Sequence, residues 1–338
     1  MAESSDMAQE IAEIPVVAER QLSQGYELRS AIQRIRSFAP RVMTFCGRGS
    51  SGQVGVFLRY LFEARLGMLV SAAAPSIITA YHARPDMQDA LFIVISQSGL
   101  SPDLVAATAR ARELGALTLA IVNDAGSPAA QAAELILPID AGPEHAVAAT
   151  KTVVASMLTG ARLVAALAND KQLEAALSRL PARFTTALAC DWSRWTDALA
   201  AAPAAFVTAR GYALAAAREI ALKLTESLRL PALAYSAAEL RHGPRAALTA
   251  NTPLLALRPD DETAPGVDEL VRNLQASGAT VFVAGGAGAT LPWIGADHSV
   301  CDSMAMLLPA YRAIESATRR RGFDPDRPQH LAKVTRTL

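Results

Sequence analysis

Several features that mark specialised classes of protein are missing from this sequence of 338 residues. It has only three cysteines, which are far apart and form no CxxC or Cys/His group, so we expect neither a disulfide framework nor a zinc site. Its 32 basic and 32 acidic residues give a formal net charge of zero. This balance gives no electrostatic bias towards nucleic acid or a membrane surface. We therefore expect no metal, no nucleic-acid partner and no membrane partner.

Long apolar segments are also missing. No uninterrupted apolar run reaches the length that a membrane-spanning helix needs. The chain opens with an acidic stretch that has no apolar centre, MAESSDMAQEIAEIP, and this does not resemble a signal peptide. The simplest expectation is a cytoplasmic protein. Hydrophobic residues make up 51% of the chain, which is enough for a large core, and the length suggests two domains.

Apolar runs alternate with helical patterns along the first half of the chain. Short buried parallel strands are predicted at residues 42–46, 68–70, 91–96 and 117–123. Helix-like stretches such as GVFLRYLFEARLG and PDLVAATARARELG lie between them. This alternation predicts an α/β fold with parallel sheets flanked by helices.

The second half of the chain repeats the spacing of the first. Arg-Gly follows a strand at 48–49 and again at 210–211, an offset of 162 positions. The strand at 91–96 maps by the same offset onto 253–258, and the Gly-Ala pair at 115–116 has its counterpart at nearly the same offset. We infer two α/β lobes of one architecture. The predicted division is a helical arm (1–40), a first lobe (41–169), a helical connector (170–202), a second lobe (203–325) and a tail that closes the active site (326–338).

Short hydroxyl side chains cluster behind the strand at 91–96. In the stretch SQSGLSPD, Ser96, Gln97 and Ser98 fall at the carboxyl end of that strand, where open parallel sheets bind ligands. Ser101 is a predicted N-cap, with Pro102 as the first helical residue. Free amides at a helix N-terminus attract anions. The cluster predicts a site for a phosphate monoester that needs no metal; the alternative is a capped turn with polar filler.

A second turn rich in glycine and serine, CGRGSSG at 46–52, follows the first strand. It matches the GxGxxG pattern of dinucleotide-binding folds. However, the second predicted strand, in MLVSAAAPS, lacks the acidic residue that this fingerprint uses to bind ribose. A nicotinamide dehydrogenase is therefore the weaker interpretation. Ser50 and Ser51 instead predict a second anion-binding turn.

Three charged residues share one face of a predicted helix in the second lobe. Glu219, Lys223 and Glu226 are spaced i, i+4, i+7. Such a pattern is ordinarily a surface stripe of ion pairs. The apolar residues around Lys223 indicate partial burial instead. A buried glutamate has a raised pKa, which suits the transfer of protons near neutral pH.

Six motifs in unbroken order resemble the SIS (sugar isomerase) family: GRGSS, SQSGLSPD, AGPEHAVAATK, AREIALKLTE, ELRHGP and the closing LAKV. Within that family the sequence is similar to the SIS-type glucosamine-6-phosphate deaminases and to the isomerase half of glucosamine-6-phosphate synthase. The resemblance implies two flavodoxin-like lobes, a homodimer, a hexosamine or hexose phosphate substrate and no cofactor.

The resemblance also assigns roles by motif position. Glu226 matches the base that moves a proton between C1 and C2 of the sugar. His242 matches a histidine that helps to open the sugar ring and comes from the neighbouring subunit. Lys333 matches a tail lysine that forms a Schiff base with the open-chain ketose. The positions that match substrate-binding residues are Ser50, Ser51, Ser96, Gln97, Ser98 and Ser101 for the phosphate, Val147 and Ala148 for the sugar, and Glu219 and Lys223 beside the base.

The sequence departs from the synthases in ways that bear on the reaction. The first lobe begins near residue 40, so we expect no N-terminal glutaminase domain and no glutamine-derived ammonia. Leu100 stands where the synthases have Glu, and GRGSS replaces a CGTS-type turn. We therefore expect the hydrolytic direction, from glucosamine-6-phosphate and water to fructose-6-phosphate and ammonia.

Three alternatives to this reaction stay open. One is synthesis from free ammonia, and another is galactosamine-6-phosphate as the substrate. The third is a sugar-phosphate sensor without activity. Sensors of this kind carry a helix-turn-helix domain, for which residues 1–40 are too few and too acidic.

Overall fold

The computed structural model describes residues 4–334, which form two compact units. The five-stranded unit comprises residues 16–144, 151–178 and 332–334. The four-stranded unit comprises residues 4–15, 145–150 and 179–331. Each unit is therefore assembled from segments that are far apart in the sequence. The five-part division of the chain given above stays a prediction.

The sheet of the five-stranded unit is parallel throughout, with the strand order β2-β1-β3-β4-β5. Its strands are β1 (Val42–Cys46), β2 (Leu69–Ala72), β3 (Ala90–Ser96), β4 (Leu117–Val122) and β5 (Leu135–Pro138). Every residue of β3 and β4 is buried, which explains why these strands appear in the sequence as continuous apolar runs. The four strands expected in this half are confirmed, and β5 adds a short edge strand.

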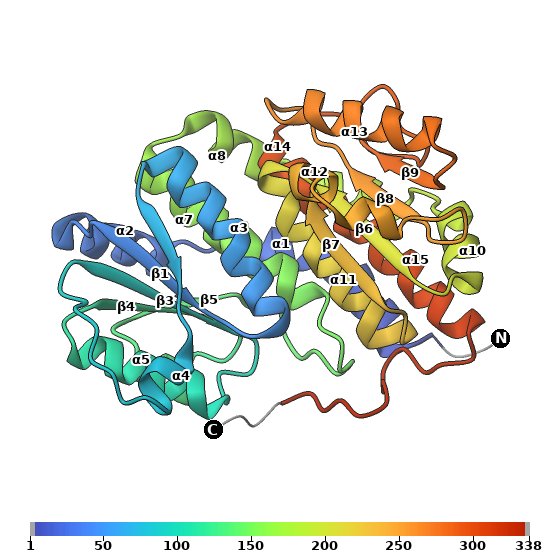
Figure 1. The fold of residues 1–338 in the computed structure, drawn as a ribbon. Coiled ribbons are helices and arrows are strands. Elements are labelled where there is room, and N and C mark those ends of the chain that lie inside the picture. The colour runs from blue at the N-terminus through green and yellow to red at the C-terminus, as the bar shows by residue number, and fades with distance from the viewer. Residues whose placement is uncertain (1–3, 335–338) are drawn as a thin grey trace. The chain divides into compact units, whose positions relative to one another are not determined.

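The five-stranded unit also contains helices. They are α2 (Tyr26–Phe38), α3 (Gly49–Leu66), α4 (Pro75–Thr79), α5 (Pro102–Glu113), α6 (Pro128–Ala132), α7 (Lys151–Ala168) and α8 (Lys171–Ser178), together with the last part of α1 (Asp6–Ser23). Helices α3 and α7 lie side by side (Figure 1). Among the described residues, α7 alone is long and apolar enough to cross a membrane, but 78% of it is buried in the structure. Its apolar character is that of a core helix.

The four-stranded unit repeats the same order of strands, β7-β6-β8-β9, and is again parallel. Its strands are β6 (Ala205–Ala209), β7 (Ala232–Ser236), β8 (Leu254–Leu257) and β9 (Val281–Ala284). The order matches that of β2-β1-β3-β4, and β8 falls where the sequence offset places the counterpart of β3. The structure therefore confirms the α/β fold and the two lobes of one architecture.

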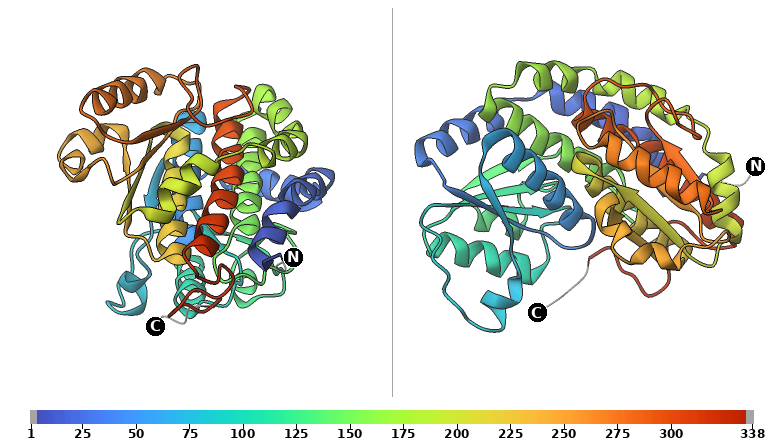
Figure 2. Two further views of the ribbon diagram at one scale, coloured as in Figure 1. Left: turned by 90° about the vertical axis from the view of Figure 1, so that its right-hand side faces the viewer. Right: turned by 45° about the horizontal axis from the view of Figure 1, so that its top comes forward.

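The helices of the four-stranded unit are the first part of α1, α9 (Leu180–Leu188), α10 (Ser193–Ala201), α11 (Leu214–Leu228), α12 (Ala237–Arg241), α13 (Ala264–Ala276), α14 (Ser299–Ala305) and α15 (Leu307–Arg320), with short 3-10 turns η1 (Gly211–Ala213) and η2 (Pro244–Ala247). Figure 2 shows α15, in red, beside α11, in yellow, and the two helices are in contact. On another helix, α13, Val267 and Leu270 pack with Leu254 and Ala256 of β8 in one buried cluster. Helix α11, which carries the predicted acid–base residues, is held by contacts with β6, β7 and α15.

Candidate active site

The two serine-rich turns follow neighbouring strands of the five-stranded unit. Ser50 and Ser51 lie in the first turn of α3, just after β1, and the stretch 96–101 joins β3 to α5. Strands β1 and β3 pair directly, and β2 and β4 lie on their opposite sides. The strand order therefore changes direction at this point, which is where doubly wound sheets bind ligands beyond the carboxyl ends of their strands. The sequence placed the hydroxyl cluster correctly at that edge.

Hydroxyl oxygens in the second turn are already used as acceptors. The Ser96 hydroxyl accepts the Gly99 amide at 3.0 Å, and the Ser98 hydroxyl accepts the Leu100 amide at 3.2 Å. A serine hydroxyl has one proton to donate and two lone pairs to accept with. These bonds fix the oxygens and leave the protons to be donated elsewhere. The turn is therefore built to present O–H donors.

Ser101 occupies the N-cap position of α5 and Pro102 opens the helix, both as predicted. The Ser101 side chain makes no capping hydrogen bond; its carbonyl accepts the amides of Leu104 and Val105, each at 3.1 Å. This is a departure from the expected capping role. It adds a third hydroxyl that the helix itself does not use, at the positive end of the helix dipole.

An ion pair that the sequence did not reveal joins the two turns. The carboxylate of Asp103, which is 3% exposed, accepts from Nε of Arg48 at 3.1 Å and from its Nη2 at 2.8 Å. Both residues fall inside the quoted motifs, but 55 positions separate them and nothing in the pattern pairs them. Burial, with a smaller contribution from Asp103, raises the pKa of Cys46 to about 12. The Cys46 thiol at the end of β1 therefore stays neutral.

Lys333 lies in the same unit and is held by a buried carboxylate. Its Nζ donates to Oε2 of Glu144 at 2.9 Å, and the side chain of Glu144 is fully buried. Glu144 also accepts the Thr152 amide at 3.1 Å and the Thr152 hydroxyl at 2.7 Å. Sequence reasoning missed Glu144, although its motif, AGPEHAVAATK, was part of the family resemblance.

The charged stripe on α11 is present and lies inside the four-stranded unit. Lys223 forms a close ion pair with Glu226, and its Nζ lies 3.5 Å from Oε1 of Glu219. The Tyr311 hydroxyl on α15 donates to the same Glu219 oxygen at 3.3 Å. The side chains of Lys223 and Glu219 are 1% exposed and that of Glu226 is 22% exposed. The partial burial inferred from the apolar neighbours is therefore confirmed, and Glu226 is the member that solvent or a ligand can reach.

His242 is exposed at the end of α12 and borders a cavity of about 610 Å³ together with Arg241 and Asn273. The described residues show no hydrogen bond between His242 and the stripe on α11, and the stripe does not line this cavity. Val147 is half-buried and Ala148 is buried, and both lie in the loop 145–150 of the same unit.

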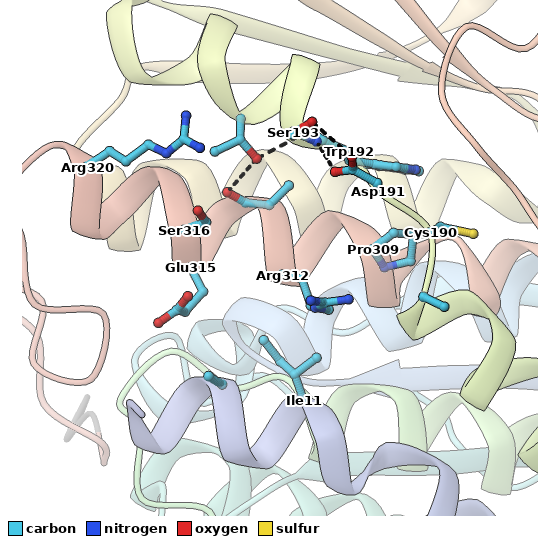
Figure 3. Close-up of a pocket in the computed structure, with 14 residues that line it drawn as sticks. Ile11, Cys190, Asp191, Trp192, Ser193, Pro309, Arg312, Glu315, Ser316 and Arg320 are labelled. Carbon is cyan, nitrogen blue, oxygen red and sulfur yellow. Dashed lines mark hydrogen bonds between the residues drawn. The ribbon is translucent and has the colours of Figure 1, made fainter. Parts of the chain in front are cut away.

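A separate cavity of about 490 Å³ contains none of the predicted site residues. Arg312, Glu315 and Ser316 of α15 line it, with Asp191 and Ser193 opposite (Figure 3). The Ser193 amide donates to Asp191 at 2.9 Å, so these two residues already bond to each other.

In residues 4–334 no group of three His, Cys, Asp or Glu side chains is arranged to hold a metal ion.

Comparison with known proteins identifies the family. A family model described as the SIS domain matches residues 40–166 and 198–287. This chain belongs to the SIS domain family. The strand order, the serine turns and the two matched segments agree with the family predicted from the motifs.

Two kinds of relative resemble this SIS protein along nearly its whole length. Glutamine–fructose-6-phosphate aminotransferase (isomerizing) of Methanothermobacter thermautotrophicus is 32% identical over 97% of this chain and 56% of its own length. The chain thus spans about half the length of that curated relative. Among solved structures, a candidate phosphosugar isomerase from Silicibacter pomeroyi DSS-3 is 37% identical with a TM-score of 0.91, covering 96% of this chain and 100% of the other.

A second solved structure agrees in fold. Glucosamine-6-phosphate deaminase from Thermotoga maritima is 20% identical, with a TM-score of 0.81 over 98% of this chain and 100% of its own. At this identity the similarity concerns the fold.

Proposed function

We propose that this SIS protein is an isomerising amino-sugar-phosphate deaminase that converts glucosamine-6-phosphate and water into fructose-6-phosphate and ammonia. The observation that carries the proposal is the stripe on α11, in which a buried ammonium holds a reachable carboxylate, Glu226. The aminotransferase relative is named for fructose-6-phosphate, which supports a hexose phosphate as the substrate class.

The phosphate would be bound in the five-stranded unit by Ser50, Ser51, Ser96, Gln97, Ser98 and Ser101. Two features support this role: the bonds within the turn that leave hydroxyl protons to donate, and the switch point at which the turns lie. The Arg48–Asp103 pair would hold the two turns at a fixed spacing while keeping the Asp103 charge compensated.

Glu226 would act as the base once the ring is open. It removes the proton from C2 of the open-chain aldehyde and returns it to C1, while the C1 oxygen gains one proton and the C2 amine loses one, which leaves an imine at C2. Attack of the Lys333 amine on C2 releases ammonia and forms a Schiff base with the lysine, and water then releases the ketose. Lys333 must first lose a proton, and Glu144, 2.9 Å away, is positioned to accept it. Glu219 and Lys223 would orient the base.

We also propose a cytoplasmic homodimer in which His242 assists ring opening in the partner subunit. The exposed position of His242 beside a cavity supports a role towards a second chain. Synthesis from free ammonia and turnover of galactosamine-6-phosphate remain the alternatives within the same chemistry.

The test is to incubate the full chain with glucosamine-6-phosphate and to measure ammonia and fructose-6-phosphate together. The same assay with galactosamine-6-phosphate tests the alternative substrate. Incubation with fructose-6-phosphate and ammonia tests the synthesis direction. Absence of turnover of every hexosamine phosphate by wild-type protein would refute the proposal.

The variant Glu226→Gln should retain binding of inorganic phosphate and lose turnover by about 10²–10⁴-fold, because the transferring group is gone. The matched control is Glu174→Gln on α8, whose carboxylate pairs with exposed Lys171. Full activity of Glu226→Gln would show that another residue is the base.

A further inference from the structure

Three segments of the four-stranded unit meet at one point: the first turns of α1, the loop 145–150 and the segment that follows α15. Hydrogen bonds connect each pair of them. The loop contains Val147 and Ala148, which were expected to line the sugar. The first turns of α1 and the part of the segment after α15 that belongs to this unit contain no predicted site residue.

The first connection is a helix cap formed between the two ends of the chain. The carboxylate of Asp326 accepts the amide of Asp6 at 2.9 Å and that of Met7 at 2.8 Å. The first amides of a helix have no partner within the helix, and a negative charge is favoured there. The hydroxyl of Ser5 accepts the Ala8 amide at 3.1 Å and donates to Glu315 of α15 at 2.7 Å. The start of α1 is thus fixed to α15 and to the segment behind it.

The second connection fixes the loop. Glu10 of α1 is 3% exposed. Its Oε1 accepts the amide of His145 in a short hydrogen bond and the amide of Ala146 at 3.4 Å. The next amide, that of Val147, donates to the Asp326 carbonyl at 3.1 Å. Three consecutive amides at the start of the loop are therefore held by two residues, Glu10 and Asp326.

We propose that Glu10 and Asp326 are positioning residues that set the conformation of the loop 145–150 for the carbohydrate part of the substrate. The proposal rests on the proposed function in one respect, the role of this loop beside the sugar. It predicts an effect on sugar recognition that is separate from phosphate recognition, because the serine turns belong to other strands in the other unit.

The chemistry of position 10 favours a carboxylate over its amide. A carboxylate oxygen accepts two N–H donors in charge-assisted bonds. Glutamine has the same shape, but its single carbonyl oxygen carries no charge. If the side-chain amide is turned the other way, its NH₂ group faces the backbone amides, and two donors form no hydrogen bond. Glu10→Gln therefore tests the charge while keeping the volume.

The experiment compares Glu10→Gln with Glu19→Gln, which alters an exposed glutamate further along the same helix. Hydrogen exchange at the amides of His145 and Ala146 should become about tenfold faster or more in Glu10→Gln, because a charge-assisted bond is lost. Affinity for glucitol-6-phosphate, an open-chain analogue that cannot isomerise, should fall by about tenfold. Affinity for inorganic phosphate should stay within about twofold. The control should match wild type in all three.

A second variant approaches the same loop from the other side. Asp326→Asn should speed exchange at the Asp6 and Met7 amides and cause the same selective loss of glucitol-6-phosphate affinity. It keeps the inference testable if Glu10→Gln fails to fold.

Two results would overturn the inference: unchanged exchange at His145 and Ala146 in Glu10→Gln, or an equal fall in affinity for both ligands, which would indicate a general loss of structure. The proposed function fails in a different way. In that case wild-type protein itself would turn over no hexosamine phosphate, while the exchange measurement would still report on the loop.

Discussion

At the scale of single residues, the serine turn depends on a glycine. Gly99 has a φ of +64°, and a Cβ at this position would lie 2.1 Å from Oγ of Ser127. Its amide also donates to Ser96. Any side chain here strains the backbone and displaces Ser127. The turn that presents the Ser96 and Ser98 hydroxyls therefore requires glycine at position 99.

Gly99→Ala can be compared with Gly67→Ala, because Gly67 has nearly the same φ, +63°, but open space around its missing Cβ. Both variants carry the backbone strain of about 1–2 kcal/mol. Only Gly99→Ala adds the steric clash, of about 1–3 kcal/mol. We expect a lower free energy of unfolding for Gly99→Ala in urea titrations, with weaker binding of inorganic phosphate. Equal unfolding midpoints for the two variants would contradict the close contact.

At the scale of elements, α11 shows how a helix accommodates charges in a core. Lys223 is 1% exposed yet lies between two carboxylates, one of which also accepts the Tyr311 hydroxyl. Desolvation of a lone ammonium would be prohibitive, so the pairing is what permits burial. The same arrangement fixes Glu226 on its exposed side.

Lys223→Met keeps the length of the side chain and removes its charge. The buried carboxylate of Glu219 then loses its ammonium, and breaking a buried pair in this way costs about 3–5 kcal/mol. The matched control is Lys171→Met, because the Lys171 side chain is 81% exposed and its pair with Glu174 contributes at most about 1 kcal/mol. Chemical denaturation compares the two. If both variants unfold at the same denaturant concentration, the buried pair does not stabilise the fold.

Local sequence patterns predicted the helices and strands well, but they did not predict which residues far apart in the sequence form pairs. The apolar runs of β3 and β4, the helix start at Pro102 and the shared face of Glu219 and Lys223 all follow from spacing within one element. The pairing of Lys333 with Glu144, 189 positions away, depends on how the chain folds back and leaves no periodic signal. Strand β5 was not predicted; its four residues, LILP, lie at the edge of the sheet and end in proline, which is unusual inside a strand.

The roles of the predicted site residues stay predictions. Structure fixes where Ser98, Glu226, His242 and Lys333 lie within their units.

At the scale of the whole molecule, the two sheets have the same order of strands, but the residues that follow corresponding strands differ. After β1 comes GRGSS, whereas after β6 comes RGYA, without serines. After β8, where the serine turn would have its counterpart, Arg258 forms a two-pronged pair with Asp268, with both bonds at 2.9 Å. The repeated architecture therefore keeps the hydroxyl cluster in one unit only.

A buried carboxyl group predicts how stability changes with pH. Burial raises the pKa of Asp302 from its ordinary 3.8 to about 6, although Arg183, 2.7 Å away, opposes the shift. Because the pKa is higher in the folded state, the folded protein holds this proton more tightly. The resulting stabilisation is fully present below about pH 4 and is lost as the pH rises through about 6, and it amounts to about 3 kcal/mol at most.

Melting temperatures measured between about pH 4 and pH 7 on wild type and Asp302→Asn test this expectation. The stability of wild type relative to the variant should decrease with rising pH. Asp86→Asn, at an exposed position, serves as the control. Parallel curves for wild type and Asp302→Asn would show that the group does not titrate in this range.

The cap that Asp326 provides for α1 has a consequence for folding during translation. The carboxylate lies 320 positions behind the first amide that it accepts. At a ribosomal speed of about 5–20 residues per second, the helix start emerges about 15–60 s before the group that caps it. During translation the first turn of α1 therefore lacks this cap until residue 326 has been made, and the four-stranded unit can acquire its native form only after that point.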